Sequence, residues 1–242
     1  MVKVKSVVIA MKSPGKPQAK RQILDERRSP SSTEPTHKRG RPRSFDRDEA
    51  LNAALGLFWR HGYDATSLND LTAAMNVTPP SLYTAFGSKK QLFIEALDLY
   101  ARTYGASPAM AEATTARGAI EGLLRESAKQ FPSPDHPSGC FTVLAATNCT
   151  EASSDVEALL RTKRLESEAG LRKRLDRAVE EGELPEGTDT AALAKFYGVV
   201  IQGMSVQARD GASNKELERV VDTAMALWPG PAKPSPKSKK RG

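Results

Sequence analysis

Three arginines lie within five residues near the beginning of the chain, in the sequence RGRPR at residues 39–43. Each guanidinium group carries a permanent positive charge, and the intervening Gly40 and Pro42 favour a slim, extended backbone. Such a segment suits the narrow minor groove of A·T-rich DNA, where the negative potential attracts arginine. Arg41 and Arg43 are therefore candidate DNA contacts, with a plain solvated basic linker as the alternative.

A second group of reactive side chains, His136, Cys140 and Cys149, lies in the stretch HPSGCFTVLAATNC. Their spacing matches no strong zinc-binding pattern, and no orienting group or oxyanion site accompanies a Cys–His nucleophile. We therefore expect no metal site, no cofactor and no enzyme activity. Cys140 follows a glycine and would be activated at a helix N-terminus, so a redox-sensing thiol is the alternative to a packing or pocket-lining role for both cysteines.

The residues after the arginine segment are expected to form helices that begin at capping signals. Asp46 is the predicted N-cap of a first helix, which Gly62 ends as a left-handed residue. Ser67 and Asp70, three positions apart, form the capping box of a short second helix that ends near Asn76. Apolar residues recur at helical spacing in both segments, as expected for helices with one buried face.

Two adjacent prolines, Pro79 and Pro80, mark the start of a third helix. With Thr78 as the N-cap they occupy the first two helical positions, where backbone N–H groups have no partner within the helix. This helix is predicted to end at Gly87, and a fourth begins at Ser88. About three residues then separate the second and third helices, which is the length of a helix-turn-helix bend. In that motif the second helix of the pair enters the major groove of DNA.

Residues 39–97 closely resemble the DNA-binding domain of TetR/AcrR-type transcriptional regulators, above all in GYDATSLNDLTAAMNV and SLYTAFGSKKQLF. The resemblance implies that residues 78–86 form the recognition helix, whose groove-facing residues are Pro80, Ser81 and Thr84. It also implies phosphate contacts from four residues: Ser67, Thr78, Tyr83 and Lys89. Hydroxyl groups and helix N-termini are good donors to phosphate oxygens, which makes these roles physically sensible. Leu82 and Phe86 are assigned to the core.

Tyr83 and Lys89 each also have a plainer interpretation. Tyr83 would close the small three-helix core as a partly buried aromatic residue. Lys89 and its neighbour Lys90 would be solvated residues at the start of the fourth helix. Because a helix dipole disfavours lysine at the N-terminus, the bound phosphate is the preferred explanation for Lys89.

Past residue 105 the sequence predicts a larger helical domain, with helices at about 117–131, 140–149, 153–181, 188–208 and 214–228. The helix at 153–181 has an apolar stripe that we expect to face inward: Val156, Leu160, Leu171, Leu175 and Ala178. The helix at 188–208 is apolar on nearly every side, so we expect a second copy of the chain to cover it. Residues 188–228 are therefore predicted to form a homodimer whose two recognition helices meet a near-palindromic operator.

Charge is distributed unevenly along the chain, whose net charge is +7. Residues 1–43 hold 12 Lys and Arg against 3 Asp and Glu, and residues 229–242 hold five against none. We predict disordered basic arms at 1–44 and 230–242, a DNA-binding domain at 45–104, and an effector-binding and dimerisation domain at 105–229. No signal peptide or membrane-spanning run is recognisable, and the two cysteines suit a reduced, cytoplasmic protein.

These observations together predict an all-α, homodimeric transcriptional regulator that binds double-stranded DNA. The simplest form is a repressor that a small apolar effector releases from its operator. Two alternatives remain open. One is a regulator that senses redox state through Cys140, and the other is an architectural protein that binds A·T-rich DNA through the arginine segment.

Overall fold

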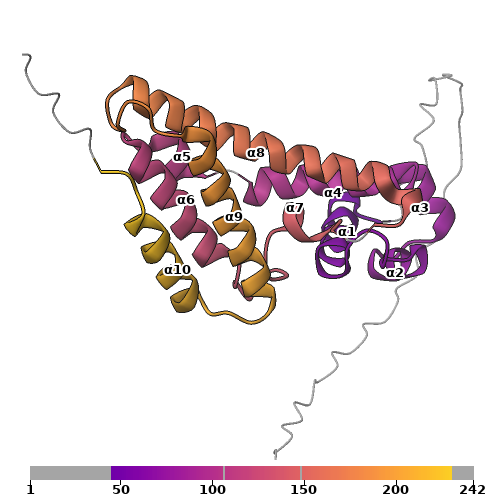
Figure 1. The fold of residues 1–242 in the computed structure, drawn as a ribbon. Coiled ribbons are helices and arrows are strands. Elements are labelled where there is room, and N and C mark those ends of the chain that lie inside the picture. The colour runs from indigo at the N-terminus through magenta and orange to yellow at the C-terminus, as the bar shows by residue number, and fades with distance from the viewer. Residues whose placement is uncertain (1–44, 106, 148, 231–242) are drawn as a thin grey trace, which may run out of the picture. The chain divides into compact units, whose positions relative to one another are not determined.

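Every element of regular structure in the described part of the chain is a helix, as Figure 1 shows. The computed structural model describes residues 45–105, 107–147 and 149–230. The predicted N-terminal arm, with Arg41 and Arg43, lies outside these residues, and so does the predicted C-terminal arm apart from Gly230. The predicted all-α class is confirmed. In chain order the helices are α1 (Arg47–His61), α2 (Leu68–Ala74), α3 (Pro79–Phe86), α4 (Lys89–Tyr104), α5 (Pro108–Glu112), α6 (Ala116–Gln130), α7 (Phe141–Leu144), the 3-10 turn η1 (Glu151–Ser153), α8 (Ser154–Glu180), α9 (Thr190–Arg209) and α10 (Asn214–Ala226).

The first two helices begin at the predicted caps. The Asp46 carboxylate accepts the N–H groups of residues 48 and 49 at 2.8 and 3.1 Å. Ser67 and Asp70 form the reciprocal capping box of α2. Gly62 follows α1 with φ 83° and ψ 173°, so its φ is positive as predicted but its ψ is not helical. That region of backbone conformation is accessible essentially only to glycine.

The paired prolines open α3 as predicted. Pro79 and Pro80 occupy its first turn, and the Thr78 hydroxyl accepts the backbone N–H of Ser81. In the bend before them, Asn76 has φ 51°, a left-handed conformation that asparagine tolerates better than most residues. The short connection between α2 and α3 therefore has the helix-turn-helix form.

The helices α1–α4 share one hydrophobic core. Its fully buried members include Phe58 of α1, Leu71 of α2, Leu82 of α3 and Phe93 of α4. The same cluster also takes in Phe141 of α7 and residues at the beginning of α8. Because the core is continuous and closely packed, a shift of α7 would change the packing of the helix-turn-helix residues that it contacts.

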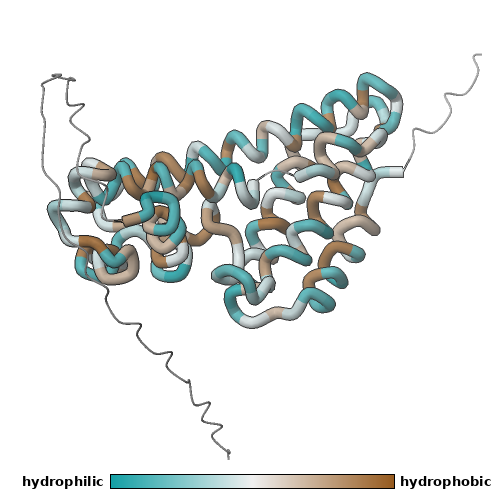
Figure 2. The backbone as a smooth tube through the Cα atoms, turned by 180° about the vertical axis from the view of Figure 1, so that it is seen from behind, coloured by the Kyte–Doolittle hydropathy of each residue, from teal (hydrophilic) through white to brown (hydrophobic). Residues whose placement is uncertain are grey.

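A second core lies among α6, α8, α9 and α10. Figure 2 shows hydrophobic residues recurring at intervals along these helices, which is typical of helices with one buried face. The inner stripe predicted for the long helix is buried as expected: Val156, Leu160, Leu171, Leu175 and Ala178. The ion pair between Lys195 and Glu168 joins α9 to α8 on the surface.

Two expectations for this half of the chain were wrong. The helix predicted at 140–149 ends at Leu144, because the chain turns away there and the carbonyl of Ala145 accepts the backbone N–H of Tyr63 at 2.8 Å. A long-range hydrogen bond thus overrides the local helical pattern.

The short helix α5 was missed. It begins at a Ser107 cap followed by Pro108, which is a helix start signal. The helix has only five residues, and that is too few to show an apolar periodicity.

Candidate nucleic-acid interface and helical cavity

The helix α3 presents one face to the core and the opposite face to solvent. Leu82 and Phe86 are buried, as predicted, whereas Pro80, Tyr83 and Thr84 are exposed. The Tyr83 side chain is 46% exposed, so the plainer interpretation of this residue as a core aromatic does not fit. The solvent face is the one that the family resemblance assigns to DNA.

The serine and threonine hydroxyl groups proposed to contact DNA are already engaged in hydrogen bonds within the protein. Thr78 Oγ1 and Ser81 Oγ lie 2.9 Å apart, and Thr84 Oγ1 donates to the Pro80 carbonyl at 2.8 Å. The Ser67 hydroxyl donates to Asp70 at 2.6 Å within the capping box. In this arrangement Thr84 and Ser67 offer acceptor lone pairs, so donation to a phosphate or base requires their hydroxyl groups to rotate.

Arg47, which the sequence analysis did not single out, anchors the C-terminal end of α3. Its guanidinium group lies 4.5 Å from the centre of the Phe86 ring and pairs with Glu95 of α4 at 2.6 Å. It also lies 3.4 Å from the Ala85 carbonyl oxygen. One side chain of α1 thus contacts both α3 and α4. Its partners are 38 and 48 residues away, so no local pattern could have indicated this role.

The two lysines at the start of α4 have different surroundings. Lys89 places its ammonium group 4.4 Å from the centre of the Tyr63 ring, and burial lowers its pKa although Asp64 opposes the change. Lys90 instead forms an ion pair with Asp155 of α8. A cation over an aromatic face is a favourable but readily exchanged contact. The phosphate role of Lys89 stays a prediction.

A cavity of about 850 Å³ lies between the segment 131–143 and the helices α4, α5, α6, α8 and α9. More of its surface is apolar than polar, with contributions from Tyr104, Phe131 and Leu171. Polar and charged side chains also line the wall at many points, among them Arg164 and Gln202. The cavity is built from segments distant in sequence, so its existence was not foreseen from residue spacing.

Cys140 lies on the wall of this cavity and is the N-cap of α7, which has only four residues. The Tyr100 hydroxyl donates to its Sγ at 3.2 Å, and burial together with this thiol strongly raises the pKa of Tyr100. Cys149 lies apart from the cavity, where burial and nearby carboxylates raise the pKa of its thiol. Both thiols are free. These positions fit the pocket-lining alternative for Cys140 and the packing alternative for Cys149.

Two kinds of feature are absent from the described residues. Within the part of the chain that the structure describes, no three His, Cys, Asp or Glu side chains are grouped so that they could hold a metal ion. Across the same residues, none of the helices combines the length and apolar character that crossing a membrane requires.

The sequence matches two family models, one of bacterial regulatory proteins of the tetR family over residues 50–96 and one of the tetracyclin repressor-like C-terminal domain over residues 119–224. The HTH-type transcriptional repressor ComR of Escherichia coli is 38% identical over 194 residues, which cover 79% of this chain and 92% of ComR. The chain belongs to the TetR family. It is therefore a DNA-binding transcriptional regulator and not an enzyme.

Two other relatives of this TetR-family chain extend the comparison. A solved structure of the TetR family transcriptional regulator CifR, a cysteine mutant complexed with 26-bp double-strand operator DNA, is 44% identical with a TM-score of 0.76. The match covers 78% of this chain and 100% of the CifR chain. The HTH-type transcriptional repressor BdcR of Escherichia coli is 28% identical over 191 residues, which are 74% of this chain and 86% of BdcR.

Proposed function

We propose that this regulator is a repressor that binds a near-palindromic operator as a homodimer and leaves it when a small apolar effector fills the helical cavity. The observation that carries the proposal is the solvent face of α3, with Tyr83 and Thr84 exposed while Leu82 and Phe86 hold the helix to the core. The likeness to a CifR structure in complex with operator DNA supports binding to an operator duplex.

Apolar side chains on α9 and α10 support the homodimer. Val199 and Val206 of α9 are 58% and 44% exposed, and Val220 of α10 is 41% exposed. Leu227, just past α10, is 64% exposed and borders a groove between the two helices. Helices that are apolar on their outer faces need a partner surface. A second copy would supply the same surface about a twofold axis, and would bring two α3 helices to successive turns of DNA.

The cavity supports the response to an effector. Its volume of about 850 Å³ lies in the range of small-molecule sites. The mostly apolar surface of the cavity favours a compound with a largely apolar surface, while Arg164 and Gln202 would orient a polar group on it. For the compound to release DNA, it must bind more tightly to the conformation that does not fit the operator.

The phosphate contacts proposed for α3 and α4 predict two different responses to salt. Replacing Lys89 by glutamine should weaken binding to every duplex and lower the slope of log affinity against log salt by about one per subunit, because one phosphate neutralisation is lost. Replacing Tyr83 by phenylalanine should weaken binding by about tenfold or more without changing the slope, because a neutral phenol releases no counterion.

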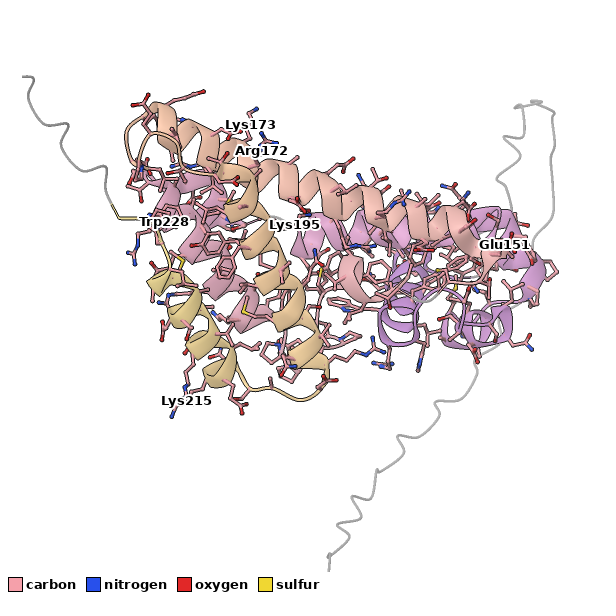
Figure 3. All side chains as sticks on the ribbon, viewed as in Figure 1. Glu151, Arg172, Lys173, Lys195, Lys215 and Trp228 are labelled. Carbon is pink, nitrogen blue, oxygen red and sulfur yellow. The ribbon has the colours of Figure 1, made fainter. Side chains whose placement is uncertain are left out.

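Fluorescence anisotropy with a labelled duplex at several salt concentrations measures both quantities. Lys173→Gln is the matched control, since it removes one exposed charge from α8 (Figure 3) and should leave affinity and slope unchanged. An unaltered slope in Lys89→Gln would remove this lysine from the proposed interface, and an unaltered affinity in Tyr83→Phe would do the same for the tyrosine.

A further inference from the structure

One segment of the chain contacts both the cavity and the turn between α1 and α2. We call its described residues, 139–147 and 149–155, the connector. At its beginning Cys140, Thr142 and Val143 line the cavity. The Cys140 backbone N–H donates to Ser205 Oγ of α9 at 2.7 Å, and the Thr142 carbonyl accepts from Arg164 of α8 at 3.0 Å. A molecule in the cavity therefore lies against the connector.

At its other end the connector binds the turn that follows α1. The Ala145 carbonyl accepts the Tyr63 backbone N–H at 2.8 Å. The Asp64 carboxylate accepts the Thr150 backbone N–H at 2.6 Å and the Ser153 hydroxyl at 2.5 Å. These bonds lower the pKa of Asp64, the one to Ser153 most. The carboxylate is therefore ionised near neutral pH, where it accepts both bonds as charge-assisted contacts.

The same turn contacts the lysine proposed to hold DNA. The Tyr63 ring lies under the Lys89 ammonium group, and Lys89 also helps to lower the pKa of Asp64. Tyr63 packs in addition against Phe58 and Phe93 in the core of the helix-turn-helix. A displacement of the turn thus changes the surroundings of Lys89 and of the packing that supports α3.

Building on the proposed repressor function, we propose that the connector transmits the state of the cavity to the DNA-binding helices. In this proposal Asp64 is the positioning residue, because its carboxylate fixes the turn after α1 to the connector. The bonds to Asp64 and Tyr63 hold the turn where Lys89 meets a phosphate. When the connector moves, these bonds no longer fix the turn. Because coupling between two sites is reciprocal, DNA bound at α3 must also restrain the connector on the cavity wall.

Hydrogen exchange of the full chain, with and without a duplex selected by the wild-type protein from a random pool, tests this without an identified effector. In the wild type the duplex should slow exchange in α2 and α3 and also, by about fivefold or more, in residues 139–147. In Asp64→Ala the duplex should still slow exchange in α2 and α3 but should lose its effect on residues 139–147. Glu180→Ala, which removes one exposed carboxylate from the end of α8, is the control and should behave as the wild type.

The proposal is overturned if the wild type shows no slowing at residues 139–147, or if Asp64→Ala retains it. If the duplex no longer slows exchange in α2 and α3 of Asp64→Ala, Ser153→Ala takes the place of that variant, since it removes a single bond on the connector side. Loss of the slowing at residues 139–147 in Ser153→Ala then supports the proposal, and its retention overturns it. The repressor proposal is judged separately, because a selected site without twofold symmetry would contradict the homodimer whatever the exchange of the connector shows.

Discussion

Replacing Trp59 by alanine should lower the free energy of unfolding by about 3–5 kcal/mol, the usual cost of deleting a fully buried aromatic side chain. Trp59 is 2% exposed and is the largest fully buried side chain of the described residues. Its ring stacks on His136 with centroids 4.7 Å apart and meets Tyr100 edge to face at 4.8 Å. Its Nε1 donates to the Gly139 carbonyl at 3.2 Å. Alanine would leave both a cavity and an unpaired buried carbonyl.

Chemical unfolding followed by circular dichroism, at one protein concentration for all variants, measures this change. Trp59→Phe separates its two causes, because it keeps most of the packing and loses the hydrogen bond, for an expected cost of about 1–2 kcal/mol. Tyr83→Ala is the control for an exposed aromatic residue and should change stability by no more than about 0.5 kcal/mol. A loss in Trp59→Ala no larger than in Tyr83→Ala would contradict the structure of this core.

Replacing Gly62 by alanine should cost about 2–3 kcal/mol for two independent reasons. The backbone at φ 83° and ψ 173° is strained for any residue with a Cβ atom. A Cβ atom there would also lie 3.1 Å from the Ala145 carbonyl oxygen, which is the acceptor of the Tyr63 N–H bond. The substitution therefore strains the turn and pushes against the connector at once.

Gly56 supplies the matched control for that substitution. It lies within α1, and a Cβ atom at this position would meet nothing within 4 Å. Gly56→Ala should therefore stabilise the protein by about 0.5–1 kcal/mol, because alanine has the higher helix propensity. Both variants are compared by thermal and chemical unfolding. Equal effects of the same sign would contradict the positive-φ conformation of Gly62.

The helices that carry the candidate site were predictable because their signals are local. Asp46, Ser67, Thr78 and Ser88 each cap a helix at the predicted position, and capping depends on residues within one turn. The burial of Leu82 in α3 likewise follows from helical spacing. The role of these residues in contacting DNA rested on the family resemblance and stays a prediction for each of them.

The remainder depends on contacts between residues far apart in the sequence. The predicted helix at 140–149 stops early because Ala145 bonds to Tyr63, some 80 residues before it. Arg47 and Trp59 were overlooked for the same reason, since their partners lie 38–80 residues away. The cavity too arises only when five helices and the segment 131–143 come together. Periodicity and capping carry no information about such pairings.

Selection of duplexes from a random pool, followed by footprinting and determination of the number of chains bound, tests the central claim most directly. The account predicts a near-palindromic site protected symmetrically about its centre, with two half-sites about one helical turn apart, roughly 34–36 Å, and two chains per duplex. Protection of A·T-rich DNA without an inverted repeat, or one chain bound to an unsymmetrical site, would contradict it.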